Sequence, residues 1–292
     1  MIQEKQLIPL KFDLVFKKVF GDENDLQPIR CLLKRILNIE PKEINILNSE
    51  IIGKPYKDKN VNVDLIVTLE DNTHVMIEIN TDVNSALIDR NFFYLCRVIS
   101  KNLRPSISYN ELNKHIQINF DFKGSHKNAI MHYKMMSLET NEILTDKLEI
   151  VRIDVPYFST KWYNTGKKGL TEKERFIALF NVSNKETAKN ISNGDKDMEK
   201  ILKKIENASE DEEIIGAYDA EFHRNEIERL GKMYAKEEGI KEGIKEGIKK
   251  GIKEGILESK KEIALKMLEK NMDLNTISEI TGLTKEEIKN LK

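Results

Sequence analysis

The order of hydrophobic and polar positions in the N-terminal half of the chain predicts a mixed α/β domain. Apolar residues recur at helical spacing over residues 10–20 and 25–38, which predicts two helices. A longer helix is expected over residues 84–103, with Pro105 just beyond its end. Short apolar runs bounded by polar residues predict strands at residues 43–52, 61–69, 74–80, 115–122, 130–138 and 148–156. Elements in this order favour an α/β fold with a mixed sheet flanked by helices.

The pattern changes after Gly169, where nearly every remaining segment has the spacing of a helix. The last residues predict two short helices. Gly282 forms the turn between them, and Thr284 with Glu287 has the spacing of a capping box. We therefore expect an α/β domain at residues 1–168, a helical region at 169–235, a repeat segment at 236–258 and the short helices at 259–292.

A four-residue repeat, GIKEGIKEGIKKGIKEGILE, occupies residues 239–258. Each glycine inside a helix costs about 1 kcal/mol relative to alanine, so an isolated helix with this sequence is expected to be weak. Two interpretations stay open: a charged, semi-flexible spacer, or a helix through which copies of the chain self-associate. The short terminal helices have the outline of a DNA-reading helix-turn-helix, but their length and mixed charge favour a packing or dimer role.

Two acidic residues lie within the predicted strands at 61–69 and 74–80. Side chains alternate between the faces of a strand, which places Asp64 and Glu78 on the more polar faces. The opposite faces are expected to form the core, with Val63, Leu65, Val67, Leu69, Val75, Ile77 and Ile79. An odd loop such as Glu70–Asn72 sets the two acids opposite each other, whereas a two-residue turn puts them on different faces. We predict the odd loop, or a bulge with the same effect.

Two carboxylates on neighbouring strands repel each other unless a cation lies between them. Mg²⁺ prefers oxygen ligands and is typically bound by one or two carboxylates together with substrate phosphate. A metal between Asp64 and Glu78 would therefore explain the pair, and Mn²⁺ or Ca²⁺ would suit the same oxygens. The alternative is structural, with both carboxylates facing solvent or paired with lysines.

Basic residues follow one side of the long predicted helix. Arg90, Tyr94 and Arg97 lie at three- and four-residue steps, so they share a face that can hold a phosphate backbone. The apolar side is expected at Ile88, Phe92, Leu95, Ile99 and Leu103. The alternative is that the charges only face solvent. Lys17, on the first predicted helix with Asp13, is a further cation for the acid pair or the partner in a simple ion pair.

Composition and charge narrow the setting of the protein. The formal net charge is −1, so a nucleic-acid site must be a local basic patch. The chain has 2 cysteines, Cys31 and Cys96, which argues against a disulfide scaffold or a cysteine zinc site and fits a reducing cytoplasm. No run approaches the roughly 18 apolar residues of a membrane-spanning helix, so no membrane partner is expected.

Four stretches of the sequence together resemble a known family. They are FDLVFKKVFG at 12–21, VNVDLIVTLEDNTHVMIEIN at 61–80, DRNFFYLCRVI at 89–99 and LTDKLEIVRIDVP at 144–156. Their order and spacing resemble the recombination-promoting nuclease family of the PD-(D/E)XK nuclease superfamily. The third stretch carries Arg90 and Tyr94 four apart, as the family's helix does. The resemblance covers most of the chain and implies a PD-(D/E)XK-like core with an all-helical C-terminal tail.

The resemblance implies roles for individual residues. Asp64 and Glu78 would be the metal ligands, and Asp13 would be an auxiliary acid. Asn80 falls where the family has Gln or Lys, which puts turnover in question. A lysine there would stabilise charge in the transition state, whereas Asn can only donate a hydrogen bond and has a shorter side chain than Gln.

Three hypotheses about function follow. The first is a Mg²⁺-dependent DNA endonuclease linked to recombination or mobile elements, which acts as a homo-oligomer through its C-terminal helices because one site cuts one strand. The second is a protein of the same fold that binds DNA or a partner without turnover, because of Asn80. The third is a purely structural oligomer driven by the repeat segment.

Overall fold

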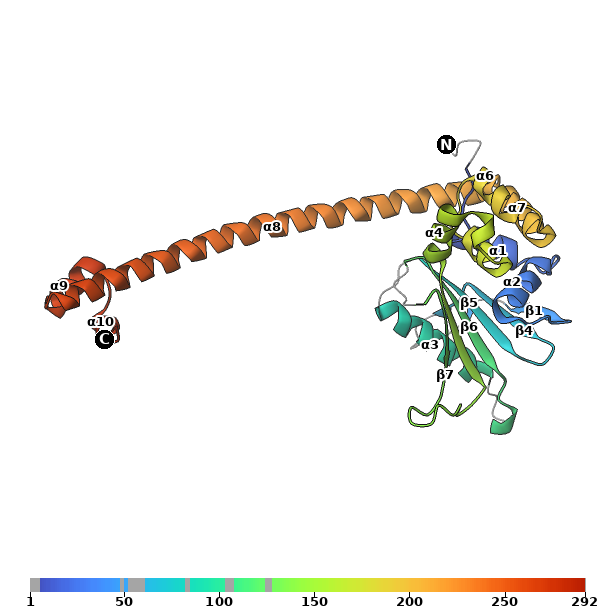
Figure 1. The fold of residues 1–292 in the computed structure, drawn as a ribbon, viewed down its shortest axis with the longest axis horizontal. Coiled ribbons are helices and arrows are strands. Elements are labelled where there is room, and N and C mark those ends of the chain that lie inside the picture. The colour runs from blue at the N-terminus through green and yellow to red at the C-terminus, as the bar shows by residue number, and fades with distance from the viewer. Residues whose placement is uncertain are drawn as a thin grey trace. The chain divides into compact units, whose positions relative to one another are not determined.

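The computed structural model describes residues 6–47, 50–51, 61–81, 85–102, 108–123 and 128–291. The chain divides into two compact units, Met1–Asp219 and Ala220–Lys292 (Figure 1). The first contains the sheet, and the second contains the end of the chain. Among the helices in these described ranges, none combines the length and the apolar content needed to cross a membrane.

A six-stranded mixed sheet forms the centre of the first unit, in the order β1-β4-β5-β6-β8-β7. Its strands are β1 (Ile44–Leu47), β4 (Leu65–Leu69), β5 (His74–Asn80), β6 (His115–Asp121), β7 (Ile130–Lys134) and β8 (Leu148–Asp154). Strands β5, β6 and β8 are parallel, whereas β1, β4 and β7 pair antiparallel with their neighbours. Two short strands, β2 (Glu50–Ile51) and β3 (Val61–Asn62), pair separately. The predicted mixed α/β fold is confirmed.

Most helices of this unit share one core with one face of the sheet (Figure 1). They are α1 (Asp13–Phe20), α2 (Gln27–Leu37), α4 (Val155–Thr165), α5 (Glu172–Leu179), α6 (Lys185–Ser192) and α7 (Lys196–Ser209). At the centre of this core Phe120 of β6 stacks on Phe180, with ring centroids 4.3 Å apart. Phe180 also contacts Phe16 and Phe20 of α1. The helices that follow Gly169 therefore complete the core of the sheet.

Helix α3 (Ser85–Asn102) packs on the opposite face of the sheet, away from the other helices of this unit (Figure 1). Its Leu95 and Val98 form a second, smaller core with Val63, Ile66 and Met76. The strict alternation of a single strand predicts Val63 in the larger core, and this prediction is wrong. The backbone is irregular between β3 and β4, and this break in the strand turns Val63 toward α3.

The buried side of α3 differs from the predicted one. Ile88 and Phe92 are 46% and 53% exposed, so the expectation that they face the sheet is wrong. Asn91, one turn before Leu95, is buried instead. Leu103 lies outside the described residues. The helix therefore brings an amide side chain to the sheet.

The sequence pattern predicts a strand that continues to residue 156, but helix α4 already begins at Val155. Strand β8 ends at Asp154, whose side chain accepts a hydrogen bond from the Tyr157 backbone N–H at 3.1 Å. Pro156 in the first turn supports the helix start, because its fixed φ suits the first turn and no N–H is lost. The remaining short elements are the 3₁₀ helices η1 (Tyr109–Glu111) and η2 (Lys167–Gly169).

The second unit is helical. Helix α8 (Glu212–Glu269) starts in the first unit, contains the whole repeat segment and is followed by α9 (Leu274–Thr281) and α10 (Lys285–Lys289). The end of α8 packs on the two short helices through Ala264, Ile277, Leu283 and Ile288. Gly282 adopts a φ of 71° at the end of α9, and Thr284 forms the predicted capping box with Glu287.

Candidate active site

The hairpin of β4 and β5 sets the relative position of the two acids. The strands pair antiparallel in a register that sets Leu65 opposite Ile77. The connecting loop Glu70–Asn72 has the odd number of residues that we predicted. Asp64 lies one residue before the paired part of β4, where a continuation of this register would set it opposite Glu78.

Asp64 is half-buried just before β4, where its Oδ2 accepts a hydrogen bond from the Ile79 backbone N–H at 2.6 Å. The pKa of Asp64 is raised to about 6, mainly by burial, and the nearby charge of Asp13 contributes to the rise. The Ile79 hydrogen bond and the positive charges of Lys17 and Arg90 lower it, but by less. The carboxyl group therefore lies in a site with too little compensating positive charge.

Glu78 is 2% exposed, and its Oε1 accepts no hydrogen bond from the described part of the chain. Burial raises the pKa of Glu78 well above its usual value, and the charge of Asp64 adds to the rise. Arg90 and Lys17 oppose this effect only in part. An unpartnered carboxylate oxygen beside a second acid is what a bound cation would satisfy.

The donor set fits a hard divalent cation. No group of three or more His, Cys, Asp or Glu side chains in the described ranges is arranged to hold a metal. Mg²⁺ commonly uses one or two carboxylates and keeps water or phosphate oxygens as its remaining ligands. The pair formed by Asp64 and the unsatisfied Glu78 meets that requirement.

Three further charged residues approach the acids. On α1 the Lys17 Nζ lies 2.9 Å from Asp13 Oδ2, and both residues shift the pKa values of Asp64 and Glu78. On α3 the Arg90 guanidinium shifts both values as well.

Tyr94 and Arg97, the other two residues predicted on α3 to bind phosphate, differ in how they relate to Arg90 and to the two acids. Arg90 lies over the ring of Tyr94, at 5.5 Å from its centroid. Arg97 is half-buried two turns further along α3 and is not among the groups with the largest effects on the two acids. Tyr94 therefore contacts Arg90, and the phosphate-binding roles of Lys17, Arg90, Tyr94 and Arg97 stay predictions.

Asn80 is buried in a network of side-chain hydrogen bonds. Its Nδ2 donates to Asp121 Oδ1 at 2.9 Å, and its Oδ1 accepts from Asn91 Nδ2 at 3.0 Å. The amide is therefore occupied by its neighbours, and its catalytic role stays a prediction.

Sequence reasoning missed the partners of Asn80. They are Asn91 on α3 and Asn119 and Asp121 on β6. Gln117 of β6 and Arg152 of β8 join the network through the Asn91 carbonyl and the Asp121 carboxylate. The signal was present in HIQINFD at residues 115–121, where polar residues alternate with apolar ones. A strand between two others with one polar face indicates a buried polar network rather than a solvent-facing side.

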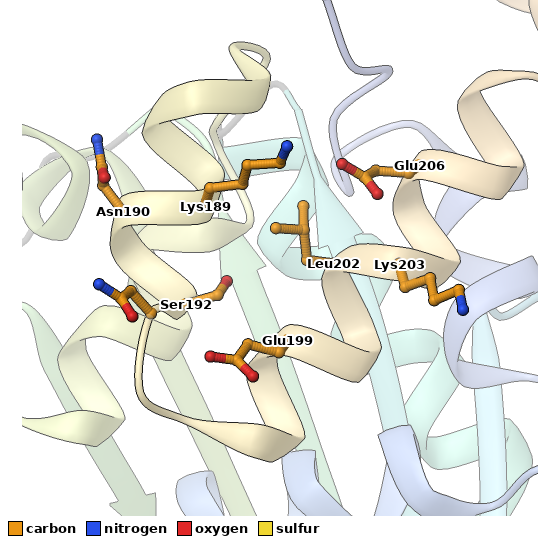
Figure 2. Close-up of a pocket in the computed structure, with 8 residues that line it drawn as sticks. Lys189, Asn190, Ser192, Glu199, Leu202, Lys203 and Glu206 are labelled. Atoms are coloured by element: carbon orange, nitrogen blue, oxygen red, sulfur yellow. The ribbon is translucent and has the colours of Figure 1, made fainter.

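A separate pocket of about 440 Å³ lies between α6 and α7 (Figure 2). Its two acids already have partners: Glu199 accepts from the Gly194 N–H at 2.9 Å, and Glu206 lies 3.2 Å from Lys185 Nζ. None of its lining residues belongs to the acid pair or to the groups around it. We therefore place the candidate active site at Asp64 and Glu78.

Two family models match the chain. A model of the PD-(D/E)XK nuclease family transposases matches residues 10–229. A model of the C-terminal HTH domain of the Rpn/YhgA-like nuclease family matches residues 257–292. No curated protein and no solved structure shows a significant match. The resemblance seen in the sequence is confirmed, and the terminal helices match a helix-turn-helix, the interpretation that the sequence pattern placed second.

Proposed function

The chain belongs to the PD-(D/E)XK nuclease family transposases, and from this premise we propose that it is a metal-dependent DNA endonuclease. The observation that carries the proposal is the buried Glu78 Oε1, which is unpartnered among the described residues, on the strand whose Ile79 N–H donates to Asp64 Oδ2. The family name also supports a role in recombination or in mobile elements.

The residues around the acid pair suit phosphodiester hydrolysis. Asp64 and Glu78 would hold Mg²⁺, or Mn²⁺ or Ca²⁺. When bound, the ion would activate water and neutralise phosphate charge. Lys17 and Arg90 bring positive charge to bind and orient the phosphate. Asp13 acts as an auxiliary acid by holding Lys17 Nζ at 2.9 Å.

The C-terminal unit supports DNA binding and self-association. A helix-turn-helix is a common DNA-reading module, which favours DNA as the partner of residues 257–292. In the repeat segment the isoleucines from Ile240 to Ile256 are 52–59% exposed, and the space beside the glycines is open. A homo-oligomer through α8 would cover these side chains. Truncation after Lys236 should then reduce the oligomer to a smaller species in sizing experiments, and an unchanged size would rule out this role.

The test of the nuclease is nicking of supercoiled plasmid with Mg²⁺, Mn²⁺ or Ca²⁺. Asp64→Asn and Glu78→Gln should each lower the cutting rate by on the order of 10³-fold, because each removes a ligand charge from the site. Glu142→Gln, at an exposed position between β7 and β8, is the matched control and should cut like the wild type. Equal cutting by the wild type and both site variants would remove the acid pair from the mechanism.

A second candidate is a DNA-binding protein of the same fold without turnover. The observation that favours it is the Asn80 amide, which is bonded to Asp121 and Asn91. In that case the wild type binds labelled duplex but does not nick plasmid with any of the three metals. A gain of cutting in Asn80→Lys or Asn80→Gln at unchanged DNA affinity would support this candidate. Cutting by the wild type would exclude it.

The cytoplasm is the setting that we propose for either activity. Cys31 and Cys96 are both free thiols, as expected in a reducing compartment.

A further inference from the structure

A chain of side-chain hydrogen bonds runs from the middle of the sheet to Arg90 on α3. Asp121, fully buried on β6, accepts from Arg152 Nε at 2.9 Å and from Asn80 Nδ2 at 2.9 Å. Asn80 Oδ1 accepts from Asn91 Nδ2 at 3.0 Å. Asn91 Oδ1 in turn lies 3.4 Å from Arg90 Nε and 3.5 Å from its Nη2. Each member thus restricts the position of the next.

The amide of Asn80 has no free donor for a reacting group. Besides its bond to Asp121, its Nδ2 lies 3.4 Å from Asn119 Oδ1. Turning this amide toward a substrate would leave buried polar groups unpaired, which is unfavourable. Position 80 therefore acts within the fold, and the positive charge that catalysis needs must come from another residue.

Asn91 attaches α3 to two strands. Its Nδ2 also donates to Asn119 Oδ1 at 2.9 Å, and its backbone carbonyl accepts from Gln117 Nε2 at 3.0 Å. These contacts hold the turn of α3 from which the Arg90 side chain projects. The ring of Tyr94 supports the other side of the Arg90 guanidinium, with 5.5 Å between the guanidinium carbon and the ring centroid.

We propose that Asn80 and Asn91 are positioning residues that hold the Arg90 guanidinium beside Asp64 and Glu78. Arg90 there supplies the positive charge that an asparagine at position 80 cannot. The planar guanidinium presents paired N–H donors that match two phosphate oxygens. This inference rests on the proposed nuclease function, since it assigns Arg90 to the scissile phosphate.

A double-mutant cycle tests the link from Asn91 to Arg90. Arg90→Met should lower kcat for plasmid nicking by on the order of 10²-fold. Asn91→Leu, of similar volume, should lower kcat by roughly tenfold with little change in KM, because it displaces a correctly placed group. The double variant should cut no more slowly than Arg90→Met alone. If the two losses multiply instead, Asn91 acts independently of Arg90 and the proposal is overturned.

Ser100→Ala on the same helix is the control, because the Ser100 hydroxyl donates only to the Arg97 carbonyl within the described contacts. It should leave kcat unchanged. Should Asn91→Leu fail to fold, which circular dichroism would show, Asn91→Ser removes the same amide with less bulk and replaces it in the cycle. The cycle is then read in the same way.

A second measurement does not require cutting. In the metal-free full chain, carbon NMR of the Asp64 carboxyl should show a higher pKa in Arg90→Met, because Arg90 lowers it in the wild type. Asn91→Leu should raise it in the same direction. A wild type that never nicks plasmid would end the nuclease proposal while this titration still decides the positioning. An unchanged Asp64 pKa in Asn91→Leu would overturn the inference.

Discussion

The two faces of the central sheet are built from alternate residues of the same strands, yet their chemistry is opposite. On the face toward α1 and α2, β6 contributes Ile116, Ile118 and Phe120 to an apolar core. On the face toward α3 the same strand contributes Gln117 and Asn119, both buried and hydrogen-bonded. One face has the side chains that stabilise a fold, and the other holds polar groups that are costly to bury.

The difference shows where stability and chemistry lie in this protein. The polar face carries Glu78, whose buried oxygen lacks a partner in the described ranges, and Asp64, whose pKa is raised to about 6. Such groups lower the stability of the metal-free protein, and the proposed metal would offset that cost. Substitutions of the apolar core residues and of the two acids should therefore change stability in opposite directions.

The largest stability loss is expected on the apolar face. Phe120→Ala removes a fully buried ring that stacks on Phe180 and should lower the free energy of unfolding by about 3–5 kcal/mol. Urea unfolding followed by circular dichroism measures the change. Asn119→Leu, the adjacent residue on the other face, is the comparison and should cost less because it removes no apolar volume. Equal losses would mean that the two faces are energetically alike.

The next effect has the opposite sign. The pKa of Asp64 is about 6 in the fold and 3.8 without perturbation, so the folded state binds the proton more tightly. The stability of the metal-free protein should fall as pH rises from about 4 to about 6, by at most about 3 kcal/mol. Asp64→Asn removes this loss and keeps an oxygen for the Ile79 N–H, so it should be more stable than the wild type at pH 7.

The addition of metal should shift the comparison between the wild type and Asp64→Asn in the opposite direction. Mg²⁺ should raise the unfolding temperature of the wild type, because it binds the folded state, and should leave that of Asp64→Asn unchanged. Glu142→Gln serves again as the control and should behave like the wild type in both measurements. A metal-free Asp64→Asn less stable than the wild type at pH 7 would show that the acid pair is not a source of strain.

The fold was largely predictable because its strands and helices follow simple periods. The odd loop Glu70–Asn72 and the alternation around it were enough to predict the register that would set Asp64 opposite Glu78. Helix α4 was missed because Val155 and Pro156 continue the apolar run of β8, although Asp154 is a good N-cap. Local patterns therefore give the hairpin but not every boundary.

The polar network could not be predicted, because it depends on contacts between distant elements. Asn80 meets Asp121 only through the parallel register of β5 and β6. It meets Asn91 only because α3 is rotated to bury that residue in place of Phe92. Neither the register of two parallel strands nor the rotation of a packed helix follows from the sequence of one segment.

A smaller pH effect is expected at the other end of the polar face. His74 and His115 are buried and stacked, with ring centroids 5.0 Å apart. Burial lowers the pKa of His115 to about 4, and the neighbouring His74 contributes. Because this pKa lies below the unfolded value of 6.5, stability is full above pH 6.5 and should fall by about 2 kcal/mol by pH 5.

Variants of His115 and of an exposed histidine separate the pH dependence caused by His115 from that caused by Asp64. His115→Gln should lose less stability than the wild type between pH 7 and pH 5, as measured by urea unfolding at each pH. His223→Gln, at an exposed position on α8, should follow the wild type. The assignment fails if the wild type and His115→Gln have the same pH dependence.

Substitution of Lys17 is expected to change the stability of the protein least, yet to slow its cutting of DNA. Its ion pair with Asp13 joins side chains that are 34% and 47% exposed, so Lys17→Met should change the free energy of unfolding by no more than about 0.5 kcal/mol. The same change removes a positive charge that lowers the pKa values of Asp64 and Glu78, so the Asp64 pKa should rise. Cutting should slow by on the order of tenfold, because one phosphate-binding charge is lost.

Lys18→Met is the matched control, since Lys18 pairs with Asp211 instead, and it should leave both the titration and the cutting rate unchanged. If Lys17→Met destabilises the fold strongly but leaves the Asp64 pKa in place, Lys17 belongs to the stabilising side of the comparison and not to the site.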